Sequence, residues 1–148
     1  MDDKFYPDPF TDEQVLVIDT PKGLIVVLGC THNGLENTIS EVRKAMNKNK
    51  IFGIIGGLHL CDTSHRKVRQ LALWLKELQV ELIACGHCTG FEAIAILYQL
   101  LGDKVSFNYV IKRIVLLICI MLDLGCDAVK QGIASDRFEL AGIMGMLD

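Results

Sequence analysis

The chain has 148 residues, of which 51% are apolar and 22% are charged, and this is enough apolar sequence for one modest domain with a core. Such a balance excludes an intrinsically disordered chain. The formal net charge is −3 and the basic residues are scattered, so we expect neither nucleic acid nor an anionic membrane as a partner.

A β-hairpin is the first predicted element, in the segment QVLVIDTPKGLIVVLG at 14–29. Two β-branched runs flank a turn at 20–23, where proline favours the turn and glycine permits an unusual backbone. A helical pattern follows and stops at NKNK, residues 47–50. Its apolar residues share one face, namely Leu35, Ile39, Val42 and Met46.

Two further strand–helix units follow the first helix. The strand IFGIIGG at 51–57 precedes a helix that begins near 62–64, where Asp, Thr and Ser offer N-caps. The strand VELIA at 80–84 precedes a helix for which the sequence at 89–92, Thr-Gly-Phe-Glu, predicts a capping box. The second of these three helices carries its apolar face at Val68, Leu71, Leu75 and Leu78.

The order of the elements is a hairpin, then helices alternating with strands, and it predicts a layered α/β fold. A last strand is expected in KVSFNYVIKRIVLL at 104–117. We divide the chain into a domain at 1–116 and a tail at 117–148. The tail has a mixed composition that allows one or two short helices, and it contains no recognisable motif.

Three of the four histidines occupy equivalent places, because His32, His59 and His87 each follow a predicted strand and precede a helix. The gaps of 27 and 28 residues each match about one strand–helix unit. Parallel strands end at one edge of a sheet, where open α/β sheets bind ligands, so the imidazoles are expected to converge. His65 differs, since it lies in the first turn of a helix beside two basic residues and is expected to be solvated.

Converging neutral imidazoles suit a metal such as Zn²⁺ or Fe²⁺ and leave a position for water or substrate. A metal there would lower the pKa of bound water and polarise a phosphoryl or carbonyl oxygen. One histidine at a strand end is usually a capping or solvent-facing residue. Three at corresponding positions favour a metal site.

The segment ACGHC at 84–88 permits two other interpretations. Strand, Cys-x-x-Cys and helix in succession are also the context of a thioredoxin-like dithiol. Against this, Ala84 stands where an aromatic is usual, all three prolines lie upstream, and the motif opens the third unit. A structural zinc site needs a second cysteine pair at short spacing, which the sequence lacks. We therefore expect the cysteines to pack beneath the loops, namely Cys30, Cys61, Cys85 and Cys88.

Three segments together resemble a known family: GCTHNG at 29–34, GGLHL at 56–60 and GHCTG at 86–90. Such segments occur in this order in metallo-β-lactamase-fold proteins, in the branch of dihydropterin-methyl-ribofuranosylaminobenzene-phosphate synthase-like metal-dependent hydrolases. The resemblance covers about residues 5–115. It implies an α/β fold that is the C-terminal half of the family's αββα sandwich.

The resemblance also implies roles for single residues. His32 and His87 would be metal ligands, His59 would be a ligand or a substrate-facing residue, and Thr89 and Gly90 would shape the substrate pocket. The implied metal is zinc or another divalent transition metal, with iron and manganese as alternatives. The implied partner is a small-molecule substrate that can carry a phosphate group.

One motif of the family is missing from the sequence, the metal-binding His-x-His-x-Asp-His of the N-terminal half. We therefore expect a half-site with weak metal binding and little or no activity in the chain alone, as in a truncated product. The alternatives are a non-catalytic subunit of a split enzyme, whose partner chain supplies the missing half, and the dithiol oxidoreductase. Self-association is also expected, because one face of the sheet would lack its cover.

Location is inferred from the start of the sequence and from its longest apolar run. The first ten residues, MDDKFYPDPF, are acidic and lack the apolar segment of a secretory signal, so we expect a cytoplasmic protein with reduced thiols. The run IVLLICIML at 114–122 has nine residues. Because about 20 are needed to span a bilayer, no membrane segment is expected.

Overall fold

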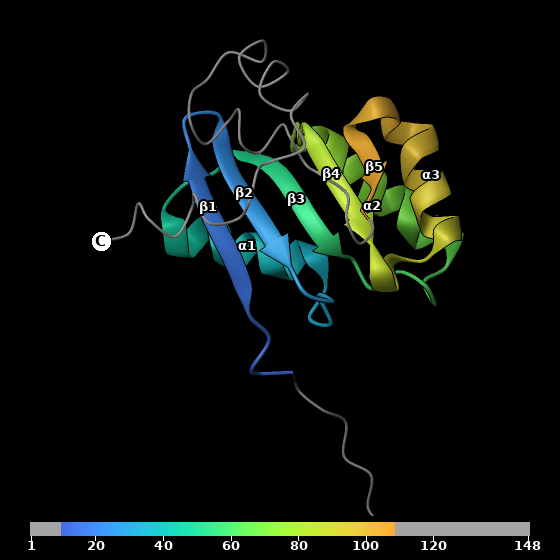
Figure 1. The fold of residues 1–148 in the computed structure, drawn as a ribbon, viewed down its shortest axis with the longest axis horizontal. Coiled ribbons are helices and arrows are strands. Elements are labelled where there is room, and N and C mark those ends of the chain that lie inside the picture. Colours follow the sequence, from blue (N-terminus) through green and yellow to red (C-terminus); the bar gives the residue numbers. More distant parts are fainter. Residues whose placement is uncertain (1–9, 109–148) are drawn as a thin grey trace, which may run out of the picture. The chain divides into compact units, whose positions relative to one another are not determined.

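The computed structural model describes residues 10–108 of the chain. In this part the strands are β1 (Val15–Thr20), β2 (Gly23–Leu28), β3 (Ile51–Gly57), β4 (Leu82–Gly86) and β5 (Val105–Phe107). They form one sheet in the order β1-β2-β3-β4-β5 (Figure 1). β1 and β2 pair antiparallel, as the predicted hairpin requires, and each later strand pairs in parallel with the one before it.

The parallel strands are connected by the α-helices α1 (Leu35–Met46), α2 (His65–Glu77) and α3 (Phe91–Leu101). Successive parallel strands are added in one direction, and right-handed crossovers then place all these helices on the same face of the sheet. Figure 1 shows α1 and α2 behind the strands, and α3 beside β5 at the end of the sheet. The predicted α/β layers are therefore present.

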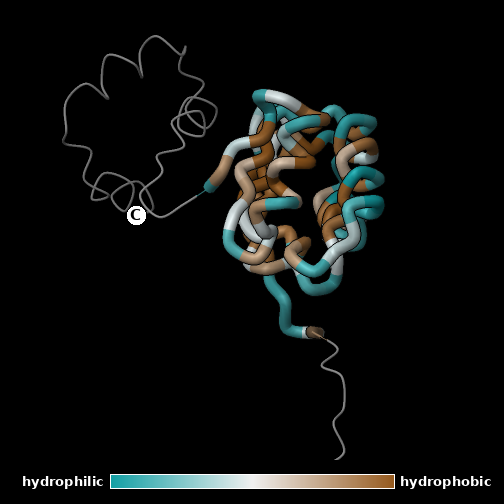
Figure 2. Tube along the Cα trace, turned by 90° about the vertical axis from the view of Figure 1, so that its right-hand side faces the viewer, coloured by the Kyte–Doolittle hydropathy of each residue, from teal (hydrophilic) through white to brown (hydrophobic). Residues whose placement is uncertain are grey.

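The core lies between the helices and this face of the sheet. Alternate residues of β2 face the helices, and Leu24, Val26 and Leu28 are all buried there. Ile54 of β3 and Ile83 of β4 continue the same layer. Burying one such side chain contributes about 2 kcal/mol, so the layer stabilises the sheet whose edge carries the loops. Figure 2 shows the apolar residues gathered inside and hydrophilic residues on the outer turns.

α2 begins directly after one of its predicted N-cap residues, but the hydrogen bonds at the helix starts differ from the sequence prediction. Ser64 is the N-cap of α2, but its side chain makes no capping hydrogen bond to the described residues. The N-cap of α3 is Gly90, which has no side chain to form one. The capping box predicted at 89–92 is wrong, because the Thr89 hydroxyl bonds to the Leu58 N–H of another loop and to Gly86 O at the end of β4. Glu92 lies 3.0 Å from Nε2 of His65, which is exposed as expected.

Two boundaries also need correction or fall outside the described region. β4 begins two residues later than predicted because its pairing with β3 starts at Gly53 and Leu82. The predicted strand beyond residue 108, the tail at 117–148 and the domain boundary before it lie outside the described residues. No helix in the described part is long and apolar enough to cross a membrane.

Candidate metal centre at the carboxyl edge of the sheet

Three loops follow the carboxyl ends of β2, β3 and β4, and they carry all the histidines of the predicted site. We call them the first loop (29–34), the second loop (58–64) and the third loop (87–90). The strands are parallel and adjacent, so the loops meet at one edge of the sheet. The third loop is a single turn of 3-10 helix, His87–Thr89, before α3 begins.

The first loop is fixed to the end of β3 by two hydrogen bonds. The Gly57 N–H donates to Gly29 O at 2.9 Å, and the Thr31 hydroxyl donates to Gly57 O at 2.6 Å. Gly57 is needed for this approach, because a Cβ there would lie 2.6 Å from Cys88 Sγ and 2.7 Å from Gly29 O. The missing side chain thus lets the loops close upon one another.

The second and third loops are joined through Thr89, whose side chain is fully buried. Its hydroxyl accepts a hydrogen bond from the Leu58 N–H at 3.0 Å and donates one to Gly86 O at 2.7 Å. The Cys88 carbonyl accepts hydrogen bonds from two N–H groups of the second loop, those of Leu60 and Cys61, at 3.2 Å each. The three loops therefore form one cross-linked platform.

Each loop places a non-glycine residue in the left-handed region of backbone space, at or beside its histidine. The φ angles are 65° at Thr31, 47° at His59 and 52° at His87. This conformation is uncommon for residues other than glycine, and residues held in it cluster at functional sites. The platform therefore stores backbone strain where the histidines project.

His32 and His59 form a ring pair at this edge. Their centroids lie 4.7 Å apart with the planes at 72°, and the Phe10 ring stacks on the His32 ring with the centroids 4.4 Å apart. Nδ1 of His32 lies 3.3 Å from a carboxylate oxygen of Glu13. The structure thus brings two of the three predicted ligands together.

Glu13 also holds the backbone that carries His32. Its carboxylate accepts hydrogen bonds from the His32 N–H at 2.6 Å and the Asn33 N–H at 3.0 Å. Burial alone would raise the pKa of Glu13, but the N–H donors of Asn33 and His32 and the nearby imidazole outweigh it and hold this pKa below its ordinary value. A carboxylate in this place favours the His32 tautomer with its proton on Nδ1. The lone pair of Nε2 can then coordinate a metal ion.

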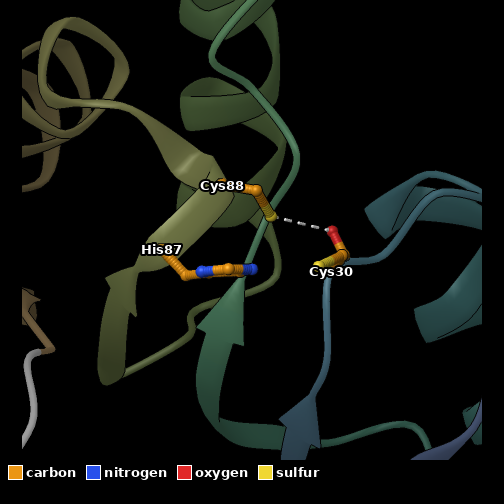
Figure 3. A group of neighbouring side chains, drawn as sticks. All are labelled: Cys30, His87 and Cys88. Atoms are coloured by element: carbon orange, nitrogen blue, oxygen red, sulfur yellow. Dashed lines mark hydrogen bonds between the residues drawn. The ribbon is translucent and has the colours of Figure 1, made fainter.

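His87 lies with two cysteines. Cys30 Sγ, Cys88 Sγ and a ring nitrogen of His87 all lie within 4.8 Å of one another. Figure 3 shows the three side chains gathered at this edge. The Cys88 thiol donates to the Cys30 carbonyl at 3.4 Å, and burial raises its pKa above the ordinary value. His87 is exposed, and both cysteines are partly exposed. The arrangement offers two sulfur donors and one nitrogen donor to solvent.

A cavity of about 290 Å³ opens beside this group. Its lining comes from the carboxyl ends of β2, β3 and β4, from the loops after β2 and β4, and from the residue after β5, namely Leu28, Gly29, Cys30, Gly56, Gly57, Gly86, His87 and Asn108. A larger hollow of about 510 Å³ lies along α1 near Trp74 of α2. Because none of the described residues that line the larger hollow is a histidine or a cysteine, we assign the site to the smaller cavity.

The remaining predicted residues have mixed placements. Thr89 is buried and Gly90, with φ 79°, opens α3 against Cys61, so their role in substrate binding stays a prediction. The expectation of cysteines packed beneath the loops fits Cys85, which is 1% exposed in the core, and is wrong for the exposed Cys61. Since Cys85 faces the core and the Cys88 thiol bonds to the first loop, the dithiol interpretation has no support from this geometry.

Sequence reasoning missed four contributors to the site: Phe10, Glu13, Cys30 and Cys88. Glu13 precedes the hairpin, and its separation of 19 positions from His32 hides the contact. Cys30 and Cys88 are 58 residues apart. The sequence indicates them only by their place in the motifs, since Cys30 lies two residues before His32 and Cys88 directly follows His87.

No family model matches the chain. Two curated proteins of Methanocaldococcus jannaschii are similar to it. One is a 7,8-dihydropterin-6-methyl-4-(beta-D-ribofuranosyl)-aminobenzene-5'-phosphate synthase, 42% identical over 86 residues, which are 58% of this chain and 29% of that protein. The other is uncharacterized and 30% identical over 99 residues, 67% of this chain and 36% of that protein. The chain thus spans about a third of the length of these relatives.

The fold is also similar to that of a solved structure. The crystal structure of Tm1679, a metal-dependent hydrolase of the beta-lactamase superfamily, matches with a TM-score of 0.65 and 34% identity. The match covers 70% of this chain and 40% of that one. The predicted resemblance to the synthase-like branch of the metallo-β-lactamase superfamily is confirmed, and so is the α/β fold class, as part of that fold.

Proposed function

Since the chain resembles part of the metallo-β-lactamase fold, we propose that it supplies a partial divalent-metal site to a metal-dependent hydrolase or transferase. The proposed ligands are His32, His59 and His87. The main support is the ring pair of His32 and His59, 4.7 Å apart on two cross-linked loops at the carboxyl edge of the sheet. The superfamily neighbour is itself a metal-dependent hydrolase.

The residues present fit a divalent transition metal. Imidazole nitrogen suits zinc and iron, and the Glu13 carboxylate beside Nδ1 of His32 is the kind of partner that orients a metal-binding histidine. The cross-linked loops hold the backbone of these residues in place before any ligand arrives. Zinc is our first candidate, with iron or manganese as alternatives.

A bound metal would lower the pKa of a coordinated water and polarise a phosphoryl oxygen of a small substrate. The chain's own contribution is to orient: Glu13 fixes the tautomer of His32, and Phe10 restricts its ring by stacking. The adjacent cavity of about 290 Å³ gives room for a small group such as a phosphate beside the loops. Thr89 and Gly90 shape the floor of the third loop in this proposal.

The remaining ligands would come from elsewhere, because the sequence has no His-x-His-x-Asp-His motif. We infer that the chain alone is weakly active or inactive. A second candidate is a non-catalytic subunit of a split enzyme, in which a partner chain supplies the missing motif. Association with a partner chain or a second copy, and a cytoplasmic location, belong to this proposal.

Isothermal titration of the purified chain with Zn²⁺ tests the proposal. We expect weak binding that the double variant His32→Ala/His59→Ala lowers, with little hydrolysis of a phosphodiester. The matched control is His65→Ala, an exposed histidine paired with Glu92 outside the loops. Binding that is the same in the double variant would refute the ligand assignment, and rapid hydrolysis by the pure chain would refute the partial site.

A further inference from the structure

We propose that Cys30, Cys88 and His87 form a Cys2His binding site for a thiophilic divalent metal ion of the Zn²⁺ class, distinct in its donors from the histidine pair. The only residue that this site shares with the ligands of the proposed function is His87. Two thiols and an imidazole are a donor set that zinc and related ions prefer, and a fourth position stays open to water.

The distances fit such an ion. In tetrahedral zinc sites the metal–sulfur distance is about 2.3 Å, so two sulfur ligands lie about 3.8 Å apart. The three donor atoms already lie within 4.8 Å of one another. Small side-chain rotations would therefore complete the geometry, without movement of the cross-linked backbone.

The surroundings of the two sulfurs differ from those of a packing thiol. Cys85, one residue before Gly86, is 1% exposed among apolar core residues, whereas Cys30 and Cys88 are partly exposed and both face the edge. The Cys88 thiol donates to the Cys30 carbonyl at 3.4 Å, and this contact holds the Cys88 sulfur beside the first loop. The cavity lined by Cys30 and His87 gives an ion a route to the site.

The backbone also favours this group of residues. The absent side chain of Gly57 leaves space for the Cys88 sulfur, since a Cβ would approach it to 2.6 Å. His87 has a φ of 52°, a conformation that turns the chain at the start of the third loop. When the ion binds, each thiol loses its proton to solvent, so two protons leave and two metal–sulfur bonds form.

Cobalt is the probe for this site, because Co²⁺ bound to thiolates gives a charge-transfer absorption that Co²⁺ bound to imidazoles lacks. The full chain, reduced and carrying Cys119→Ser and Cys126→Ser, is titrated with Co²⁺. We expect the thiolate band to develop, to be lost in Cys30→Ser and in Cys88→Ser, and to disappear when Zn²⁺ displaces the cobalt. Cys61→Ser is the matched control, an exposed cysteine outside the group, and keeps the band.

The two proposals fail in different ways. The variant His32→Ala/His59→Ala keeps the thiolate band if the Cys2His site is correct, whatever happens to zinc binding at the histidine pair. No band in the parent chain, or an unchanged band in both serine variants, would overturn the site. Cysteine alkylation tests the Cys2His site without any substitution in it. Zn²⁺ should slow the alkylation of Cys30 and Cys88 but not of Cys61. Equal slowing of all three cysteines would contradict the site.

Discussion

The carboxyl edge of the sheet has two halves that differ in chemistry. In one half, the rings of His32 and His59 pack edge to face, with the Phe10 ring and the Glu13 carboxylate beside His32. In the other, His87 faces two sulfurs beside a cavity. Imidazoles with a carboxylate partner accept several divalent metals, whereas thiolates select the softer ones. The same platform of loops thus offers two donor environments, and both proposed sites use His87 as a ligand.

The largest effect is expected for His87→Ala, because it removes a donor from both halves. Zinc binding should fall below that of the His32→Ala/His59→Ala variant and below that of Cys30→Ser, each of which affects one half. Titration calorimetry of the three variants beside His65→Ala measures this order. A His87→Ala chain that binds zinc as the parent does would show that the two halves share no ligand.

Gly57→Ala should destabilise the fold by up to about 3 kcal/mol, the upper range for overpacking. The new Cβ would meet a backbone oxygen at 2.7 Å, which cannot rotate away, as well as the Cys88 sulfur. Urea unfolding gives the free-energy difference. Gly29→Ala is the control in the same platform, because a Cβ there meets nothing within 4 Å. Equal stability of the two variants would show that the loops can separate at little cost.

Thr89→Val should cost about 2 kcal/mol, because it leaves the buried Leu58 N–H without its acceptor and the Gly86 carbonyl without its donor. Thermal unfolding measures the loss. Thr38→Val is the control, since its hydroxyl bonds to Gly34 O on the surface of α1. Unchanged stability, with a change confined to substrate binding, would favour a pocket role for Thr89 over a structural one.

Glu13→Gln should have the smallest effect, about tenfold weaker metal binding at the histidine pair, in line with other partners that orient metal-binding histidines. The amide keeps one acceptor oxygen for the His32 and Asn33 N–H groups but loses the charge beside Nδ1. The cobalt–thiolate band should be the same as in the parent chain. Glu41→Gln, an exposed glutamate on α1, is the control.

Much of the fold could be predicted from local pattern. The hairpin follows from two β-branched runs around a Pro-Lys-Gly turn, and the periodicity of Leu35, Ile39 and Val42 gave α1 and its buried face. The capping box at Thr89 and Glu92 failed for a tertiary reason. A buried Leu58 N–H from another loop needs an acceptor, and the Thr89 hydroxyl satisfies it in place of a helix N–H.

The sequence by itself determined the α/β order of elements and the placing of three histidines after three strands, because both depend on the spacing of residues along the chain. Only the tertiary structure decided which side chains meet. Glu13 reaches His32, and Cys30 reaches Cys88, across long stretches of chain. Such contacts depend on how closely Gly57 lets the loops approach, and on hydrogen bonds between loops, neither of which has a periodic signal in the sequence.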